Sequence, residues 1–473
     1  MKRKVKNVLV FMVLSIFSFG LMAESLSSES QNPEKMILTV DEATNYAINN
    51  SRTLKVSAID VEIAKLKKDN AWNVFVPSVQ ISGTMSRSNE ASNTSEEMKK
   101  IMEEALKEAL GLPGGGSSDT STSSEPKEAD HWKAVGNVSV NWNFSFALFE
   151  AYRTTVSNYE AGLISYEQSV KQTERDVKKM FYGMLLMQEN LKLQQEMLEN
   201  AKMRMEQAAI SYRNGQVPEL SYLQAQVTYE NKRPTVLEME QTISQQMNTF
   251  AFLLGLPYGT KLELVGTIEP EFITVDSNEL VEKYLTNRLD VQGLYKNIEL
   301  VTHGLTASKL QTFSPALALS YGFQPVVMDI TKNWFEDENN MDNGSFSVTL
   351  AWNLTNMLPF SSNMVSLRET QKNLEKLELS VATVLQSGEM EIASLVDKLK
   401  KCESSIAAME YNVELAEKAY NMTYEAYRVG TTEILDVRDS ESQLSQAKLG
   451  LLNEKYTYLT TLLDLEYAIN AKL

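Results

Sequence analysis

The chain has 473 residues, a formal net charge of -17 at pH 7 and a single cysteine, Cys402. Its 43% apolar and 23% charged residues are typical of a folded protein and exclude global disorder. The acidic balance argues against nucleic acid as a partner, and one cysteine cannot form an intrachain disulfide.

The N-terminal residues predict a secretory signal peptide over residues 1–23. Four of the first six residues are Lys or Arg, an apolar run ends at Leu21, and Ala23 offers a small residue for cleavage. No other segment has eighteen consecutive apolar residues, so there is no second candidate for a membrane-spanning helix. We therefore expect an exported chain that begins with a polar linker over 24–37.

Four segments predict β-strands of about ten residues, because polar and apolar side chains alternate along them. They cover about 74–88, 136–148, 314–326 and 344–355, and the second has the clearest alternation. In an extended strand this pattern places all the apolar side chains on one face and all the polar ones on the other.

A long acidic loop, residues 89–134, is expected between the first two strands. It contains three consecutive glycines followed by two serines, a composition typical of a flexible surface loop. A short helix over about 96–110 is expected within it. The strand, lysine and helix start that a phosphate-binding loop requires are absent.

Each pair of strands is followed by a long helical hairpin. Apolar side chains recur every seven residues on both sides of two tips, at 213–218 and 428–433, which predicts antiparallel coiled coils. Gly215 and Gly430 lie within these tips. The first long helix would span roughly 90 Å at the helical rise, which is too long for the core of a globular domain.

The same order of elements occurs twice, which predicts an internal duplication. Residues 38–257 form the first repeat, residues 276–473 form the second, and residues 258–275 connect them. The Tyr-Arg-x-Gly motif at 212–215 matches the one at 427–430. Each repeat is expected to contain a helix, a strand, a loop, a strand, a long helix, a tip and a return helix.

The amphipathic strands match the alternation of membrane barrels, with apolar side chains facing lipid and polar side chains facing water. Four strands cannot close a barrel, and open edges in lipid would leave backbone groups unsatisfied, so several chains must share one barrel. Three chains would give twelve strands around a water-filled bore. The strand pattern leaves open an alternative, a soluble sandwich packed on the helices.

The second tip and the duplicated layout resemble the TolC-type outer membrane efflux proteins. The tip at 427–437 reads Tyr-Arg-Val-Gly-Thr-Thr-Glu-Ile-Leu-Asp-Val, and the resemblance covers essentially the whole mature chain. It implies a mainly α-helical homotrimer whose twelve-stranded β-barrel lies in outer membrane lipid and continues into an α-helical periplasmic tunnel. It also implies that the tips dock onto a periplasmic adaptor protein and an inner membrane transporter of the RND or ABC type.

The resemblance assigns Asp436 and Asp439 to the closed periplasmic aperture. Three chains would place six carboxylates around the pore axis, where they would attract cations and raise each other's pKa. The alternative is that both are solvated carboxylates in the first turn of a helix, where the helix dipole favours negative charge.

Tyr427 corresponds to the tyrosine that latches the inner hairpin to the outer one. The acidic residue that is its partner in the family is replaced here by Ser221, and Thr432 occupies the position that can carry a latching arginine. A neutral hydrogen bond between Tyr427 and Ser221 would be weaker than a charge-assisted one. Packing of Tyr427 in the coiled-coil seam is the alternative.

No catalytic, cofactor-binding or metal site is predicted. His131 and His303 have no neighbours at metal-ligand spacing, so we expect solvated or helix-surface histidines, and Cys402 is expected to be a core thiol. No nucleophile elbow, P-loop or dinucleotide fingerprint occurs.

The sequence therefore predicts a passive outer membrane exit channel of a tripartite efflux or secretion system, with no enzymatic activity. Two alternatives stay open. One is a type I protein secretion duct, which uses the same kind of channel with different partners. The other, from a different class, is a soluble coiled-coil structural protein of the cell envelope.

Overall fold

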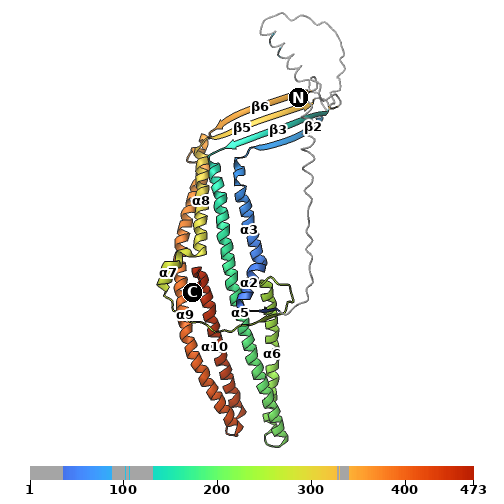
Figure 1. The fold of residues 1–473 in the computed structure, drawn as a ribbon, viewed down its shortest axis with the longest axis vertical. Helices are drawn as coiled ribbons and strands as arrows, with labels where there is room; N and C mark the ends of the chain where they lie inside the picture. The colour runs from blue at the N-terminus through green and yellow to red at the C-terminus, as the bar shows by residue number, and fades with distance from the viewer. Residues whose placement is uncertain (1–35, 88–101, 103–105, 107–131, 328–329, 331–339) are drawn as a thin grey trace.

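The computed structural model describes residues 36–87, 132–327 and 340–473, with Met102, Leu106 and Ile330 between them. The predicted signal peptide, most of the loop 89–134 with its short helix, and His131 lie outside the described residues. The described part is elongated, with one sheet at one end and long helices that run away from it (Figure 1). None of its helices has the length and apolar character needed to cross a membrane.

The sheet has four antiparallel strands in the order β2-β3-β5-β6. The strands are β2 (Ser78–Arg87), β3 (Trp132–Phe144), β5 (Ala316–Val327) and β6 (Asn340–Ala351). The pairing of β3 with β5 joins the two halves of the chain at the centre of the sheet. As a result, β2 and β6 form its two edges.

The register of the sheet places side chains of like character side by side. One row across the four strands is apolar and contains Val79, Val140, Tyr321 and Phe346. The adjacent row, on the opposite face, is polar and contains Ser78, Asn141, Ser320 and Ser347. The predicted apolar and polar faces are therefore confirmed for the part of the sheet next to the helices. Toward the far strand ends the alternation fails, since the polar face there carries the row of Thr84, Val135, Val326 and Met341.

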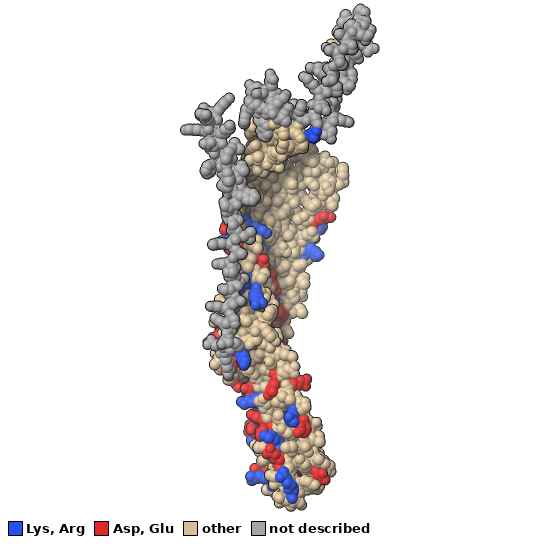
Figure 2. All heavy atoms as spheres, turned by 90° about the vertical axis from the view of Figure 1, so that its right-hand side faces the viewer, with Lys and Arg blue, Asp and Glu red and all other residues tan. Residues whose placement is uncertain are grey.

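Charged side chains are rare in the sheet and frequent on the helices. The strands contain three, Arg87, Lys133 and Asp342, which all lie toward the strand ends farthest from the helices. Figure 2 shows the same contrast over one face of the molecule, where Lys, Arg, Asp and Glu gather on the helical part. A band of the sheet without charged side chains thus separates the charges at the far strand ends from those on the helices.

Several strand boundaries differ from those expected. The strand expected to begin near residue 74 begins at Ser78, because Ala71–Phe75 form a 3₁₀-helix. The strand expected over 136–148 is β3, which starts earlier and ends at Phe144. The strand expected over 344–355 is β6, which ends at Ala351. Apolar alternation alone does not separate the end of a strand from the first turn of an amphipathic helix.

Two long helical hairpins extend from the sheet, and their tips lie together at the far end (Figure 1). The first consists of α5 (Ala147–Arg213) and α6 (Glu219–Leu253), and the second of α9 (Ser362–Arg428) and α10 (Ile434–Ile469). The other helices are α2 (Val40–Asn50), α3 (Arg52–Asp69), α7 (Ser277–Tyr284) and α8 (Leu289–Phe313), with short 3₁₀-helices at Leu285–Asn287 and Leu354–Met357. At 67 residues each, α5 and α9 are about 100 Å long at the usual helical rise.

The predicted heptad seam of the second hairpin is buried in its upper part, while the α9 seam residues from Met409 to the tip are half-buried. In α9, Ile406 is 1% exposed and Cys402 is also buried, which confirms the expected core thiol. In α10, Val437 and Leu465 are fully buried. The spacing of seven therefore identifies the face along which these two helices pack.

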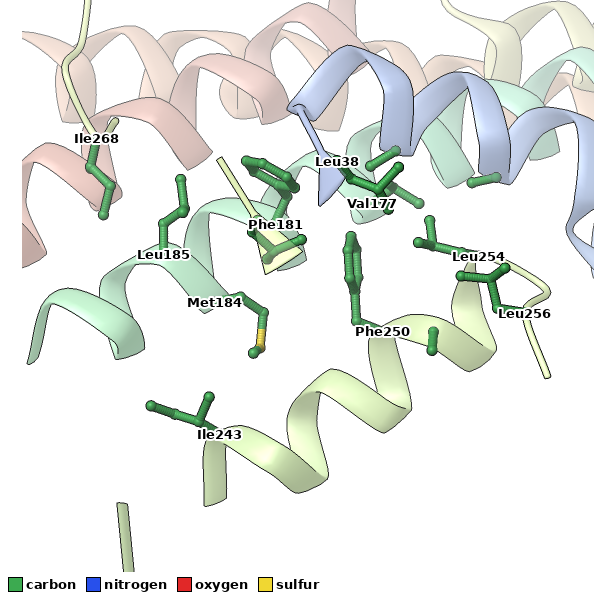
Figure 3. Packing of buried hydrophobic residues seen from close by; sticks show 14 residues of the cluster. Leu38, Val177, Phe181, Met184, Leu185, Ile243, Phe250, Leu254, Leu256 and Ile268 are labelled. Carbon is green, nitrogen blue, oxygen red and sulfur yellow. The ribbon is translucent and has the colours of Figure 1, made fainter. Parts of the chain in front are cut away.

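The main hydrophobic core lies midway along α5, where α2 and α6 pack against it (Figure 3). Val177 and Phe181 of α5 meet Phe250 of α6, and the rings of the two phenylalanines have centroids 6.3 Å apart. This core is closed by a parallel pairing of β1 (Met36–Leu38) with β4 (Leu262–Leu264). Residues 36 and 37 were expected in the linker, but they form part of this strand pair.

We predict that Phe250→Ala lowers the free energy of unfolding by about 3–5 kcal/mol, because the fully buried ring would leave a cavity in the main core. The midpoint of urea unfolding, followed by helicity, measures this loss. Phe252→Ala on the same helix is the matched control, since its side chain is 70% exposed. An equally large loss for Phe252→Ala would contradict the assignment of Phe250 to the core.

Candidate functional site at the hairpin tips

Both hairpins turn through the same backbone motif. Gly215 and Gly430 have φ angles of 71° and 80°, in the left-handed region that favours glycine. In the second tip the amide of Thr431 donates to the carbonyl oxygen of Ala426 at 2.9 Å, and the amide of Gln216 makes the equivalent bond in the first tip. These are Schellman caps, which end α9 and α5 and satisfy carbonyl groups of their last turns.

Asp436 lies in the first turn of α10 and caps that helix. Its Oδ2 accepts hydrogen bonds from the Thr432 hydroxyl at 2.6 Å and from the Glu433 amide at 3.3 Å. The carboxylate of Glu433 completes a capping box with the Asp436 amide. Asp436 therefore has a structural task at the tip that is independent of any role for its charge.

Asp439 lies one turn further along α10, on the same side as Asp436. Its Oδ1 accepts from the guanidinium of Arg438 at 3.1 Å, and both side chains are more than half exposed. Asp436 is exposed as well. In the single chain, the two predicted aperture carboxylates are thus adjacent, solvated and placed at the far end of the second hairpin.

No hydrogen bond links the three predicted latch residues to one another within the described residues. Tyr427 is half-buried on the seam of α9, and no hydrogen bond joins it to Ser221 within the described residues. Thr432 uses its hydroxyl within its own hairpin, as a donor to Asp436. In the first hairpin, the rings of Tyr212 and Tyr222 stack on each other instead, with centroids 6.2 Å apart.

A buried polar cluster that the sequence did not indicate connects the two hairpins two to three turns above the tips. Arg204 of α5 pairs with Glu441 of α10 through its guanidinium, and the two residues are 9% and 5% exposed. The amide nitrogen of Asn200, also on α5, donates to the same Glu441 oxygen at 3.1 Å. The second hairpin is thus attached to the first by a charge pair removed from water.

The charges of this cluster also affect the pKa values of side chains on the other two hairpin helices, α6 and α9. Burial and the charge of Glu441 raise the pKa of Tyr420 on α9, while Arg204 acts in the opposite direction. Burial lowers the pKa of Lys232 on α6, although the charge of Glu441 acts to raise it. All four long helices therefore contribute a polar side chain to the surroundings of Glu441.

A second polar tie joins the same two helices closer to the main core. The ammonium of Lys179 donates to both carboxylate oxygens of Asp464 at 2.9 Å and 2.8 Å, and Arg175 lies 3.8 Å from Asp464. At the usual helical rise, Asp464 is about 35 Å from Glu441 along α10. The hairpins are thus connected at two separate levels.

An open groove of about 440 Å³ lies between the hairpins on the tip side of the buried pair. Its apolar lining comes from the start of α6 and from the start of α10. These residues are Leu220, Leu223 and Val227 of the first hairpin, and Ile434 and Leu435 of the second. Arg204, Arg438 and Glu433 also line the groove, and both arginines are paired with carboxylates, so an apolar groove bordered by charges of both signs separates the two tips.

His303 lies on a helix surface, one of the two expected surroundings, but it is half-buried and paired with a carboxylate. On α8 it faces α5, where its Nδ1 lies 2.7 Å from the carboxylate of Glu150, which is 7% exposed. Glu150 also accepts from Arg153 at 2.8 Å. Among the described residues, no group of three His, Cys, Asp or Glu side chains is arranged to hold a metal ion.

We predict that Asp436→Ala loosens the start of α10, because a lost helix cap costs about 1 kcal/mol. Amide hydrogen exchange of residues 434–438 should become several times faster. Asp436→Asn is the matched variant, since its amide oxygen can still accept from Thr432 and Glu433 while the charge is removed. Equally fast exchange in both variants would show that the charge, and not the cap, orders this turn.

Two sequence comparisons bear on this arrangement. Residues 43–256 and 280–471 match the family model of the outer membrane efflux proteins. Over 139 residues, the chain is 29% identical to the outer membrane protein TolC of Salmonella enteritidis. That alignment covers 28% of this chain and 26% of TolC, so it spans about a quarter of the relative's length.

Solved structures share the fold over nearly the whole chain. The Campylobacter jejuni CmeC outer membrane channel superposes with a TM-score of 0.71 at 15% identity, covering 91% of this chain and 85% of that one. VceC, an outer membrane protein of Vibrio cholerae, gives a TM-score of 0.68 at 16% identity, covering 92% and 96%. At these identities the likeness shows a common fold.

Proposed function

This chain belongs to the outer membrane efflux protein family, and we propose that three copies of it form the passive exit channel of a tripartite efflux or secretion system. Members of this family lie in the outer membrane, with a helical tunnel in the periplasm. The observation that carries the proposal is the sheet, whose matched apolar and polar rows end in two unpaired edges, β2 and β6. In lipid those edges need partners, because their backbone groups would otherwise lack hydrogen bonds.

Edge pairing between copies satisfies this requirement. If β6 of one copy pairs with β2 of the next, three copies close a twelve-stranded barrel, with the apolar rows outward and the polar rows around the bore. The exposed apolar side chains of the edge strands support this arrangement: Val79 and Ile81 on β2, and Phe346, Val348 and Leu350 on β6. The alternative of a soluble envelope protein leaves this apolar face uncovered.

The helices supply the periplasmic part of the duct. Helices α5 and α9 each reach about 100 Å, far more than the roughly 30 Å of a bilayer core. The matching order of elements in the two halves supports an internal duplication, with the outer hairpin in 38–257 and the inner one in 276–473. In a trimer the inner hairpins would surround the axis, and Asp436 and Asp439 would form a ring of six carboxylates at the aperture.

The tips are the surface at which partners would act. We assign this end to docking of a periplasmic adaptor and an inner membrane transporter, of the RND or ABC type, because it is the end opposite the sheet (Figure 1). Energy for transport would come from the transporter. Drug or metal efflux and type I protein secretion would use the same duct.

Purification in detergent and planar bilayer recordings test the channel directly. We expect a trimer that is recovered from the outer membrane fraction and conducts ions. A protein that is recovered without detergent as a monomer, and that gives no conductance, would identify a soluble coiled-coil structural protein instead.

We predict that Asp436→Asn combined with Asp439→Asn weakens cation selectivity and relieves block by multivalent cations, because the proposed ring would lose its charge. Reversal potentials in a salt gradient measure the selectivity. Asparagine is preferred to alanine at position 436, since it removes the charge and keeps the helix cap. An unchanged reversal potential would exclude both residues from the aperture.

A further inference from the structure

We propose that the ion pair between Arg204 and Glu441 is the contact that holds the second hairpin against the first near the tips, and so keeps the periplasmic end closed. The statement about closure rests on the proposed function. The statement about packing rests only on contacts within the single chain.

The location of the pair makes it the last polar connection before the tips. Within the described residues, no other hydrogen bond or ion pair between the hairpins lies closer to Gly215 and Gly430 than those that Glu441 receives from Arg204 and Asn200. Beyond the pair, the hairpins are separated by the open groove. A movement of α10 away from α5 in this region must therefore break the pair.

Because the pair is buried, the separation of the hairpins depends on the charge of both side chains. Buried alanines lie one turn from Arg204 along α5, Ala201 and Ala208, and Ala225 of α6 is buried as well, so this level of the hairpins is shielded from water. A carboxylate in such a site needs its cationic partner, because an unpaired buried charge is strongly unfavourable. If either member is neutralised, the remaining charge gains hydration when the hairpins separate. Removing one charge should therefore favour the separated arrangement.

The position of the pair differs from that of the predicted latch. Tyr427, Ser221 and Thr432 lie at the tips and form no bond between the hairpins in this chain. Arg204 and Glu441 lie about 10 to 15 Å further up the hairpins, given the helical rise. Neutral side chains at the tips are thus compatible with closure by a charge pair above them.

The test uses the full-length protein in planar bilayers. We expect Glu441→Gln to raise the open fraction of the channel by about tenfold or more, since breaking a buried pair shifts an equilibrium by at least this factor. The double exchange Arg204→Glu with Glu441→Arg should return it toward the parent value. Glu199→Gln is the matched control, because this exposed carboxylate on α5 pairs only with Lys202 of its own helix.

Amide hydrogen exchange of residues 434–445, measured on the same samples, reports the packing without depending on conduction. We expect faster exchange in Glu441→Gln and recovery in the double exchange. If Glu441→Gln does not reach the membrane, Asn200→Ala, which keeps both charges, should show smaller changes in the same direction.

The outcomes separate the two proposals. A parent protein that does not conduct, with faster exchange in Glu441→Gln, would refute the channel and support the contact between hairpins. A conducting parent whose Glu441→Gln variant has unchanged exchange and unchanged opening would overturn the inference. Faster exchange with unchanged opening would overturn the role of the pair in closure.

Discussion

The structure depends on the packing of other helices against α5 along its whole length. A long helix in a protein is stabilised mainly by the packing of its apolar face, and different partners cover this face at each level. Near the sheet these are α3 and α8, in the middle α2 and α6, and toward the tips α6 and α10. Each level also has a polar tie: Ser157 to Glu299 near the sheet, Lys179 to Asp464 in the middle, and Arg204 to Glu441 above the tips.

The periodic parts of this fold were predictable because each carries its own local pattern. Alternation identified the strands and the faces of the sheet, and the heptads identified the seam between α9 and α10. Element ends were less predictable, since apolar residues continue in phase past Phe144 into the first turn of α5. The β1–β4 pairing was missed because three-residue strands have no detectable period, and their pairing joins segments far apart in the sequence.

The candidate site shows the same division between local and distant information. Gly215 and Gly430 were predictable because a tight turn after a helix needs a residue that tolerates positive φ. The cap at Asp436 was also encoded locally, by Thr432 and Glu433 just before the helix. Arg204 and Glu441 were not identified, although both lie beside heptad positions, where charged residues often pair between helices. Among many charged residues on long helices, sequence does not show which two become buried together.

A buried ion pair has a physical property that suits the closure we propose. An apolar contact of the same area opposes every stage of separation of the hairpins, because exposing apolar surface to water is unfavourable. Charges that leave the pair recover hydration, which offsets much of the lost attraction. Arg204 and Glu441 would thus hold the hairpins in register when they are together, yet oppose their separation less than an apolar contact of the same area would. The partner at the tips would then need to supply only a modest difference in affinity between the two states to shift the equilibrium.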